Sequence, residues 1–232
     1  DYTRTKNPTR ELVEDAIAKL EGADQGFAFS SGMAAIQTIM ALFKSGDELI
    51  VSKDLYGGTY RLFEEEWRKY GLSFHYDDFT SREYTESLIN ENTKAIFLET
   101  PTNPLMQETS ISSLAELVRK HNLLLIVDNT FYTPVLQRPI EEGAHIVIHS
   151  ATKYLGGHND VLAGLVCAKG KEICEKLAMH QNAIGAVLSP FDSWLLLRGM
   201  KTLSLRMAKH QENARELAAY LKELPEIDDV LY

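Results

Sequence analysis

Residues 144–157 read Ala144-His-Ile-Val-Ile-His149-Ser150-Ala-Thr-Lys153-Tyr-Leu-Gly156-Gly157, an apolar and β-branched run that passes into small, hydroxylated and flexible residues. The run 144–149 is short enough for a buried parallel strand, which favours a sheet covered by helices on both faces. Ser150, Thr152 and Lys153 then fall at the carboxyl edge of that strand, where open α/β sheets bind their ligands. The stretch therefore predicts both the class of the fold and the place of a ligand site.

Short apolar runs alternate with amphipathic helical segments along the rest of the chain. Strands are expected at 26–29, 48–51, 72–76, 94–98, 123–127, 145–148 and 161–168, the last of them a candidate for an antiparallel strand. Helices that connect such strands cover both faces of a mostly parallel sheet. We therefore expect an α/β fold with a mostly parallel seven-stranded sheet between helices.

The helical segments carry their own start and stop signals. Residues 10–21 predict a helix that Thr9 caps and Gly22 ends, and a second helix is expected from about Gly32. Residues 189–224 are largely helical, with Gly199 placed to kink or break the segment and Pro225 to close it.

Composition limits the function classes. With 232 residues, of which 44% are hydrophobic and 25% charged, the chain can bury a full α/β core. A formal net charge of -9 argues against a nucleic-acid partner, because phosphate backbones require a basic surface. Cys167 and Cys174 do not have the spacing of a zinc site, and no apolar run approaches the roughly 20 residues of a membrane span. We expect a cytoplasmic metabolic enzyme that has no metal site and no membrane partner.

A second polar residue follows a neighbouring apolar run. Residues 123–127 end in Asp128, a carboxylate that is costly to bury without a partner. The amine of Lys153 can trap a carbonyl once it is desolvated, and an aspartate can hold the pyridine nitrogen of pyridoxal phosphate in its protonated form. Together, Lys153 and Asp128 suggest pyridoxal 5'-phosphate as the cofactor. The alternatives are a surface lysine and a solvated helix cap.

A phosphate site is suggested by the residues between strand 26–29 and the helix that follows. Ser31, Gly32 and Met33 place backbone amides at a helix N-terminus, which favours an anion. Ser150 and Thr152 are placed to add hydroxyl groups to the same phosphate. Helix capping by Ser31 and strand-end capping by Ser150 and Thr152 remain the alternatives.

These motifs resemble the cystathionine synthase and lyase family of pyridoxal-phosphate enzymes, which act on sulfur amino acids. The matching stretches follow the family's order across the chain: Tyr2-Thr-Arg4-Thr-Lys-Asn7-Pro8-Thr9, Ser30-Ser31-Gly32-Met33, Asp54-Leu-Tyr56-Gly57-Gly58-Thr59, Glu99-Thr-Pro-Thr-Asn103-Pro104, Val127-Asp128-Asn-Thr130, Ser150-Ala-Thr-Lys153 and Ser189-Pro-Phe-Asp192. The resemblance implies the large domain of a pyridoxal-phosphate-dependent transferase of fold type I. It also implies the roles of Lys153, Asp128, Gly32 and Met33 described above.

Further site residues are implied by the resemblance alone. Tyr56 would stack on the pyridine ring and take part in proton transfer, Asn103 would lie near the phenolic oxygen, and Thr130 would support the ring. Without the resemblance, Tyr56 is an ordinary buried tyrosine and Asn103 a turn residue between two prolines. Glu99 also ends a strand at this edge, but there we expect a hydrogen bond to a neighbouring loop and assign no catalytic role.

The family pattern also predicts an assembly. Tyr2 and Arg4 would reach the phosphate of a neighbouring subunit, so the resemblance implies a homo-oligomer, a dimer of dimers. A frayed, solvated terminus is the alternative for both residues. Residues 1–224 are expected to be the pyridoxal-phosphate-binding large domain with a truncated N-terminal arm, and 225–232 the start of a further C-terminal domain.

The activity implied by the resemblance is γ-replacement on an O-acylhomoserine by cysteine or sulfide, giving cystathionine or homocysteine in methionine biosynthesis. Residues 2–9, 181–186 and 198–202 are most similar to synthase members of the family. A β- or γ-lyase that cleaves cystathionine is the alternative. Methionine γ-lyases carry a cysteine where this chain has Gly58. A non-catalytic binding protein with the same fold would have no need of Lys153 and Asp128.

Overall fold

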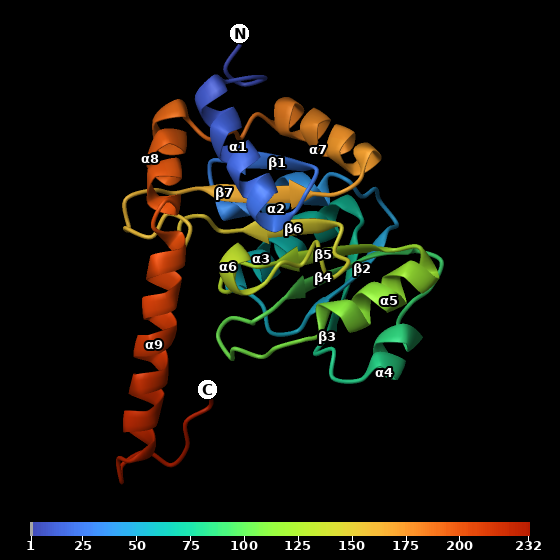
Figure 1. The fold of residues 1–232 in the computed structure, drawn as a ribbon. Coiled ribbons are helices and arrows are strands. Elements are labelled where there is room, and N and C mark those ends of the chain that lie inside the picture. The colour runs from blue at the N-terminus through green and yellow to red at the C-terminus, as the bar shows by residue number, and fades with distance from the viewer. Residues whose placement is uncertain (1) are drawn as a thin grey trace.

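Seven strands form one twisted sheet in this computed structural model, which describes residues 2–232 (Figure 1). They are β1 (Gln25–Phe29), β2 (Glu48–Ser52), β3 (Ser73–Asp77), β4 (Thr93–Glu99), β5 (Leu124–Asp128), β6 (Ile146–His149) and β7 (Gly164–Ala168). Their order across the sheet is β1-β7-β6-β5-β4-β2-β3. β7 runs antiparallel to both of its neighbours, and all other pairs are parallel. The predicted mostly parallel sheet and its antiparallel last strand are confirmed.

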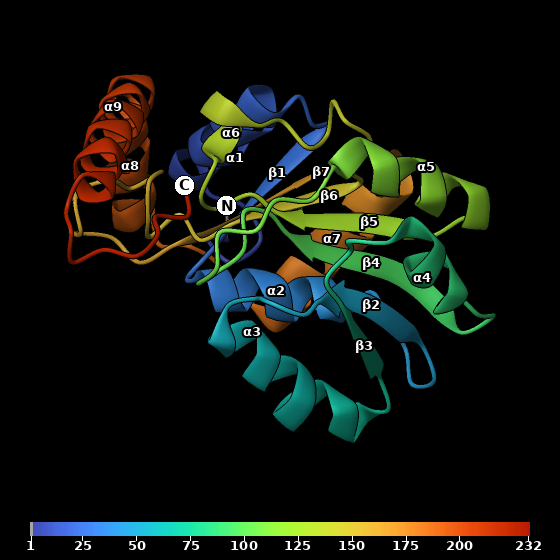
Figure 2. The ribbon, with the colours of Figure 1, turned by 90° about the horizontal axis from the view of Figure 1, so that it is seen from below.

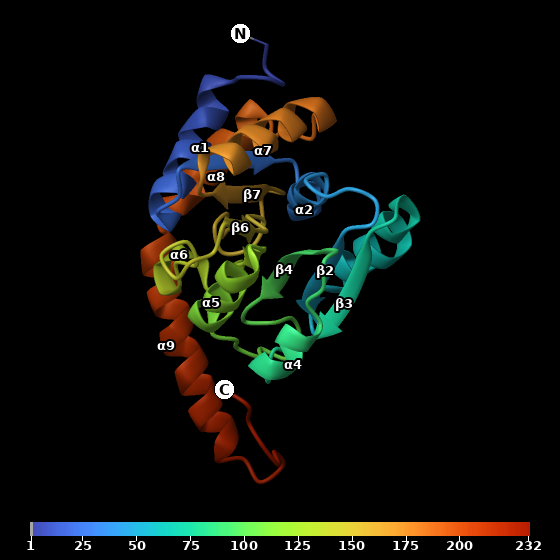
Figure 3. The same cartoon turned by 90° about the vertical axis from the view of Figure 1, so that its right-hand side faces the viewer.

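Helices cover both faces of the sheet. They are α1 (Pro8–Glu21), α2 (Gly32–Met40), α3 (Gly57–Arg61), α4 (Arg82–Ser87), α5 (Ile111–His121), α6 (Thr133–Leu136), α7 (Lys171–Ile184), α8 (Pro190–Met200) and α9 (Leu203–Lys222). A π-helical turn at Leu62–Glu66 and a 3-10 turn at Trp67–Tyr70 extend α3. Figures 2 and 3 show α1, α5 and α6 on one side of the sheet and α2 and α3 on the other.

The central strands are apolar on both faces because each face has its own core. In β4, Ile96 packs in the cluster that includes α1 and α5, whereas Phe97 packs in the cluster that includes α2 and α7. In β5, Val127 packs in the cluster that includes α1 and α5, and Ile126 packs in the cluster that includes α2 and α7. Such strands therefore appear in the sequence as continuous apolar runs instead of alternating patterns.

The start of α1 differs from the prediction. The helix begins at Pro8, and the cap is Asn7, whose Oδ1 accepts hydrogen bonds from the backbone N–H groups of Thr9 and Arg10. Thr9 lies inside the first turn, so its prediction as the cap was wrong. Proline at the first helical position suits this arrangement, because its missing N–H would have no partner there. Gly22 ends the helix at φ 71°, as expected.

The late helical segment divides at Lys201–Thr202, between α8 and α9, two residues beyond the expected glycine. Gly199 itself lies within α8, and a Cβ atom there would be 2.2 Å from the carbonyl oxygen of Gly156. The glycine is therefore required for the close approach of α8 to the loop after Lys153. Arg206 adds hydrogen bonds to the Tyr154 and Gly199 carbonyls and so attaches α9 to the same loop.

Two further observations concern function classes. Cys167 and Cys174 are buried free thiols. No helix within residues 2–232 combines the length and the apolar character needed to cross a membrane.

Replacing Asn7 by Ala should lower the free energy of unfolding by about 1 kcal/mol, because two N–H groups of the first turn lose their acceptor. Thr9→Ala is the matched control and should have a smaller effect, since no N–H of the first turn bonds to its side chain in the described structure. Denaturant unfolding measures both values. A larger loss for Thr9→Ala would contradict the assignment of Asn7 as the cap.

Candidate active site

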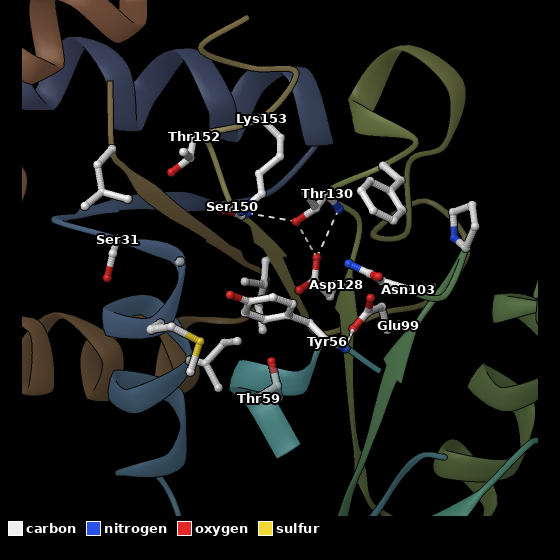
Figure 4. A pocket seen from close by; sticks show the side chains of 17 residues that line it. Ser31, Tyr56, Thr59, Glu99, Asn103, Asp128, Thr130, Ser150, Thr152 and Lys153 are labelled. Carbon is white, nitrogen blue, oxygen red and sulfur yellow. Dashed lines mark hydrogen bonds between the residues drawn. The ribbon is translucent and has the colours of Figure 1, made fainter. Parts of the chain in front are cut away.

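A pocket lies at the carboxyl ends of β4, β5 and β6, facing the N-terminus of α2 (Figure 4). Parallel pairing creates it, because the register places Glu99 opposite Asp128 and Asp128 opposite Ile148. Ten of the predicted site residues line this pocket: Ser31, Gly32, Met33, Tyr56, Asn103, Asp128, Thr130, Ser150, Thr152 and Lys153. They come from five separate segments of the chain, and the fold brings them together.

Lys153 is presented by a turn that follows β6. The turn closes through a hydrogen bond from the Lys153 backbone N–H to the Ser150 carbonyl oxygen, 3.1 Å long. The Lys153 ammonium then folds back and donates to Ser150 Oγ at 3.0 Å. Its Nζ lies 5.7 Å from the centre of the Tyr56 ring. The amine therefore lies between a hydroxyl group and an aromatic face, at the carboxyl edge of the sheet.

Thr130 connects Asp128 to Ser150. Its backbone N–H and its hydroxyl both donate to Asp128 Oδ1, at 3.0 and 2.6 Å, and the same hydroxyl accepts the Ser150 N–H at 2.8 Å. No group among residues 2–232 donates to Asp128 Oδ2 in the hydrogen bonds of the structure. One carboxylate oxygen is thus held by the protein, and the other is left for a ligand.

Two opposing effects act on the Asp128 carboxyl. Its removal from water raises the pKa of Asp128 above the ordinary value, while the bonds from Thr130 and the charges of His149 and Lys153 act to lower it. A cationic ligand group beside Oδ2 would favour the ionised carboxylate further. The position is therefore suited to a protonated ring nitrogen.

Glu99 is a pocket residue that the sequence did not assign to the site. It is 6% exposed, and its Oε2 accepts the backbone N–H of Tyr56 at 2.9 Å, which is the loop contact expected from its position. Burial, and then the negative charge of Asp128, raise the pKa of Glu99 well above 4.5. The only signal in the sequence was its place at a strand end, a place that Asp128 shares.

Tyr56 projects across the mouth of the pocket and is 46% exposed. A Cβ atom on Gly58 would lie 2.4 Å from Tyr56 Cε1, so the glycine makes room for the ring. A Cβ atom on Gly57 would have no neighbour within 4 Å. A side chain at position 57 would therefore have space, whereas a side chain at position 58 would displace the Tyr56 ring.

The start of α2 faces the pocket with its first backbone amides. Ser31 is the cap, and its Oγ accepts the Ala34 N–H at 3.0 Å, so the helix-capping interpretation of this serine is realised. Gly32 and Met33 begin the helix, where N–H groups have no intrahelical acceptor. A Cβ atom on Gly32 would lie 3.1 Å from Ser150 Cβ, so the glycine lets this helix end approach Ser150 closely.

The Thr152 hydroxyl is engaged elsewhere. It donates to the Ala163 carbonyl at 3.2 Å and accepts the Ala163 N–H at 3.1 Å, which is strand-end capping. Its contribution to a phosphate stays a prediction.

Tyr2 and Arg4 do not line the pocket that the other ten predicted residues form. Both are exposed, and the Arg4 guanidinium lies 5.3 Å from the centre of the Tyr2 ring and donates to the Asn182 carbonyl. Figure 1 shows the segment before α1 at the end of the molecule where α1 and α7 lie, and neither Tyr2 nor Arg4 lines the pocket. A role of Tyr2 and Arg4 at a cofactor site stays a prediction.

The profile of the Cys/Met metabolism PLP-dependent enzymes matches residues 1–232. The chain belongs to this family. It is 74% identical over 232 residues to a cystathionine gamma-synthase/O-acetylhomoserine (thiol)-lyase of Bacillus subtilis, and 60% identical over 233 residues to a cystathionine gamma-synthase of Haemophilus influenzae. These alignments cover 100% of the chain but 62% and 63% of the two relatives.

A solved structure shows the same fold. The cystathionine gamma-lyase of Lactobacillus plantarum, complexed with L-serine, superposes with a TM-score of 0.98 at 50% identity, covering 99% of this chain and 60% of that one. The chain thus spans about three fifths of the relatives that it matches. The expected fold type I of pyridoxal-phosphate enzymes is confirmed.

The family's cofactor is pyridoxal 5'-phosphate, and the residues present fit it. The pocket combines an amine on Lys153, a carboxylate with one unbonded oxygen on Asp128, and a helix N-terminus for a phosphate. Gly32 leaves open the space that a side chain would fill beside Ser150.

Gly58→Ala should weaken binding of pyridoxal phosphate to the full-length protein by about tenfold, because the added methyl group displaces the Tyr56 ring. Gly57→Ala is the matched control and should leave the affinity unchanged, since its methyl group meets no other atom. Absorbance titration with the cofactor measures both. Equal affinities in the two variants would contradict a requirement for Gly58.

Glu99→Gln should flatten the pH dependence of the stability of the cofactor-free protein. Because the folded-state pKa of Glu99 is raised above 4.5, the folded state holds a proton that the unfolded state has released. The stability from this proton is complete at low pH and is lost as the pH rises from about 4.5 through the raised pKa. Denaturant unfolding at several pH values compares the variant with the parent, and equal slopes would contradict the raised pKa.

Proposed function

We propose that this chain is the cofactor-binding part of an enzyme that joins an O-acylhomoserine to cysteine or sulfide by γ-replacement, giving cystathionine or homocysteine. The supporting observation is the 74% identity to the Bacillus subtilis enzyme, in an alignment that spans the whole chain and so the pocket. In this proposal, 1–224 is the large domain, and 225–232 leads into a second domain. The enzyme serves methionine biosynthesis in the cytoplasm.

Lys153 is the central catalytic residue in the proposal. When bound, pyridoxal phosphate supplies a carbonyl that an amine can trap and a ring that withdraws electrons. The Lys153 amine, once free, moves protons between neighbouring carbons of the substrate. Ser150 Oγ, 3.0 Å from Nζ, orients the amine for this task.

The remaining site residues bind and orient. Asp128 Oδ2 would hold the ring nitrogen in its protonated form, while Thr130 fixes the carboxylate through Oδ1. Tyr56 would stack on the ring and exchange protons with the substrate, and Asn103 would interact with the cofactor from its place in the pocket lining. The amides of Gly32 and Met33, together with Ser31, Ser150 and Thr152, bind the phosphate.

An oligomer completes the site in this proposal. Because Tyr2 and Arg4 are exposed and do not line the pocket of their own chain, we propose that they reach the phosphate of a neighbouring subunit. A homo-oligomer, a dimer of dimers, provides such neighbours.

A lyase that cleaves cystathionine is the second candidate. It is supported by 50% identity to a cystathionine gamma-lyase of Bacillus subtilis and 48% identity to a cystathionine beta-lyase of Lactococcus lactis, both over 232 residues. These values are lower than those for the two synthases.

Product analysis on the full-length enzyme tests the proposal. With pyridoxal phosphate, O-acylhomoserine and cysteine, we expect cystathionine, and Lys153→Ala should abolish its formation because the amine is lost. Cystathionine supplied alone should be cleaved more slowly than it is made. Formation of pyruvate and homocysteine, or of 2-oxobutyrate and cysteine, without synthesis in the first mixture would identify a β- or γ-lyase instead.

A further inference from the structure

Glu21 and His149 form a buried pair that the proposed chemistry does not use. Both side chains are 0% exposed, and His149 Nε2 lies 2.6 Å from Glu21 Oε1. Glu21 is the last residue of α1, and His149 is the last residue of β6. An acid and an imidazole at this depth are unusual in an apolar core, because their burial is costly and has to be offset by specific bonds.

The pair belongs to a longer chain of hydrogen bonds. Asn129 Nδ2 donates to Glu21 Oε1 at 3.0 Å and to the Gln137 carbonyl at 2.9 Å. Gln137 Nε2 donates in return to Asn129 Oδ1 at 3.0 Å and to the Thr100 carbonyl at 3.2 Å. We call Glu21, His149, Asn129, Gln137 and Thr100 the edge network, because it connects the carboxyl ends of β4, β5 and β6.

The edge network is next to the pocket along the chain. Thr100 follows Glu99, Asn129 stands between Asp128 and Thr130, and His149 precedes Ser150. Successive strand residues point to opposite faces of a sheet. Accordingly, Ile148 lines the pocket, while Val147, two residues before His149, packs in the cluster that includes α1. The pocket and the edge network thus occupy the two sides of the same three strand ends.

We propose that Glu21 and His149 are positioning residues for the cofactor site, which hold Asp128 and Ser150 at a fixed separation from the opposite face of the sheet. The inference rests on the proposed role of these two residues at the cofactor. Thr130 connects Asp128 to Ser150 on the pocket side, and the Glu21 carboxylate connects Asn129 to His149 behind it. Each strand end is therefore held from both faces.

Charge gives the pair a second effect on the site. The charge of His149 acts to lower the pKa of Asp128 against the effect of burial. Glu21 Oε1, 2.6 Å from His149 Nε2, lies where it can balance that charge. The carboxylate that faces a ring nitrogen is thus ionised more readily than burial alone would allow.

A purely structural role predicts a different pattern of mutational effects. Buried ion pairs contribute little net stability compared with apolar residues of the same volume. Replacing one partner alone nevertheless leaves the other polar group buried without its bond. If the pair only held α1 against the sheet, that replacement would lower the free energy of unfolding without changing how a cofactor is bound. Cofactor affinity and the spectrum of the bound cofactor separate the two roles.

The test uses the full-length protein and the variants Glu21→Gln, His149→Gln and Gln137→Ala. The two Gln variants remove a charge but keep a side chain that can form hydrogen bonds. Gln137 is partly exposed, so we expect the Gln137→Ala protein to fold even if a change at the buried Glu21 or His149 prevents folding. Thr85→Val is the matched control, because Thr85 is 0% exposed, bonds to the buried Asp77 carboxylate at 2.6 Å and does not line the pocket.

We expect Glu21→Gln and His149→Gln to weaken pyridoxal phosphate binding by about tenfold and to alter the visible circular dichroism of the bound cofactor, with a smaller change in the same direction for Gln137→Ala. Thr85→Val should lower the Tm of the cofactor-free protein with neither effect. Unchanged affinity and spectrum in both Gln variants would overturn the inference, as would equal changes in Thr85→Val. If the parent protein itself bound no pyridoxal phosphate, the proposed cofactor site would fail, and the inference with it.

Discussion

Backbone hydrogen bonds between β4, β5 and β6 hold Glu99 opposite Asp128 and Asp128 opposite Ile148, and the rest of the site is arranged around that register. The strands are apolar on both faces, so two separate cores, one beneath α1 and α5 and one beneath α2 and α7, keep the register in place. A shift of one residue would exchange the two faces of a strand. Asp128 would then point into the α1 side, and Asn129 would face the pocket.

Polar groups at the carboxyl edge divide between the two faces in the same way as the apolar residues before them. On the pocket side, the Thr130 hydroxyl joins Asp128 to Ser150, and Ser150 Oγ accepts from Lys153. On the other side, Glu21 joins Asn129 to His149. The same strand ends thus carry both the groups that face a ligand and the bonds that hold those groups in place.

Family membership and geometry explain different features of the protein. Synthases and lyases both match the whole chain, and this chain's own pocket places an amine, a carboxylate and a helix N-terminus together. In the proposal these groups bind and activate the cofactor, and the choice between replacement and cleavage depends on how the substrate's leaving group and thiol are handled. Identity of 74% over the chain, against 50% for a lyase, is what favours replacement in the proposal.

The sequence by itself determined the class of the fold, the approximate place of all seven strands and ten of the residues that line the pocket. It could do so because apolar periodicity and the polar residues after each strand are local features, and because the family resemblance implied Tyr56, Asn103 and Thr130. Tertiary structure alone decided that Asn7 and not Thr9 caps α1, and that Gly199 serves the approach of α8 to Gly156. It alone also placed Glu99 beside Asp128 and paired Glu21 with His149, 128 residues away along the chain. Such contacts depend on strand register and on how helices pack against the sheet, and neither leaves a periodic signal in the sequence.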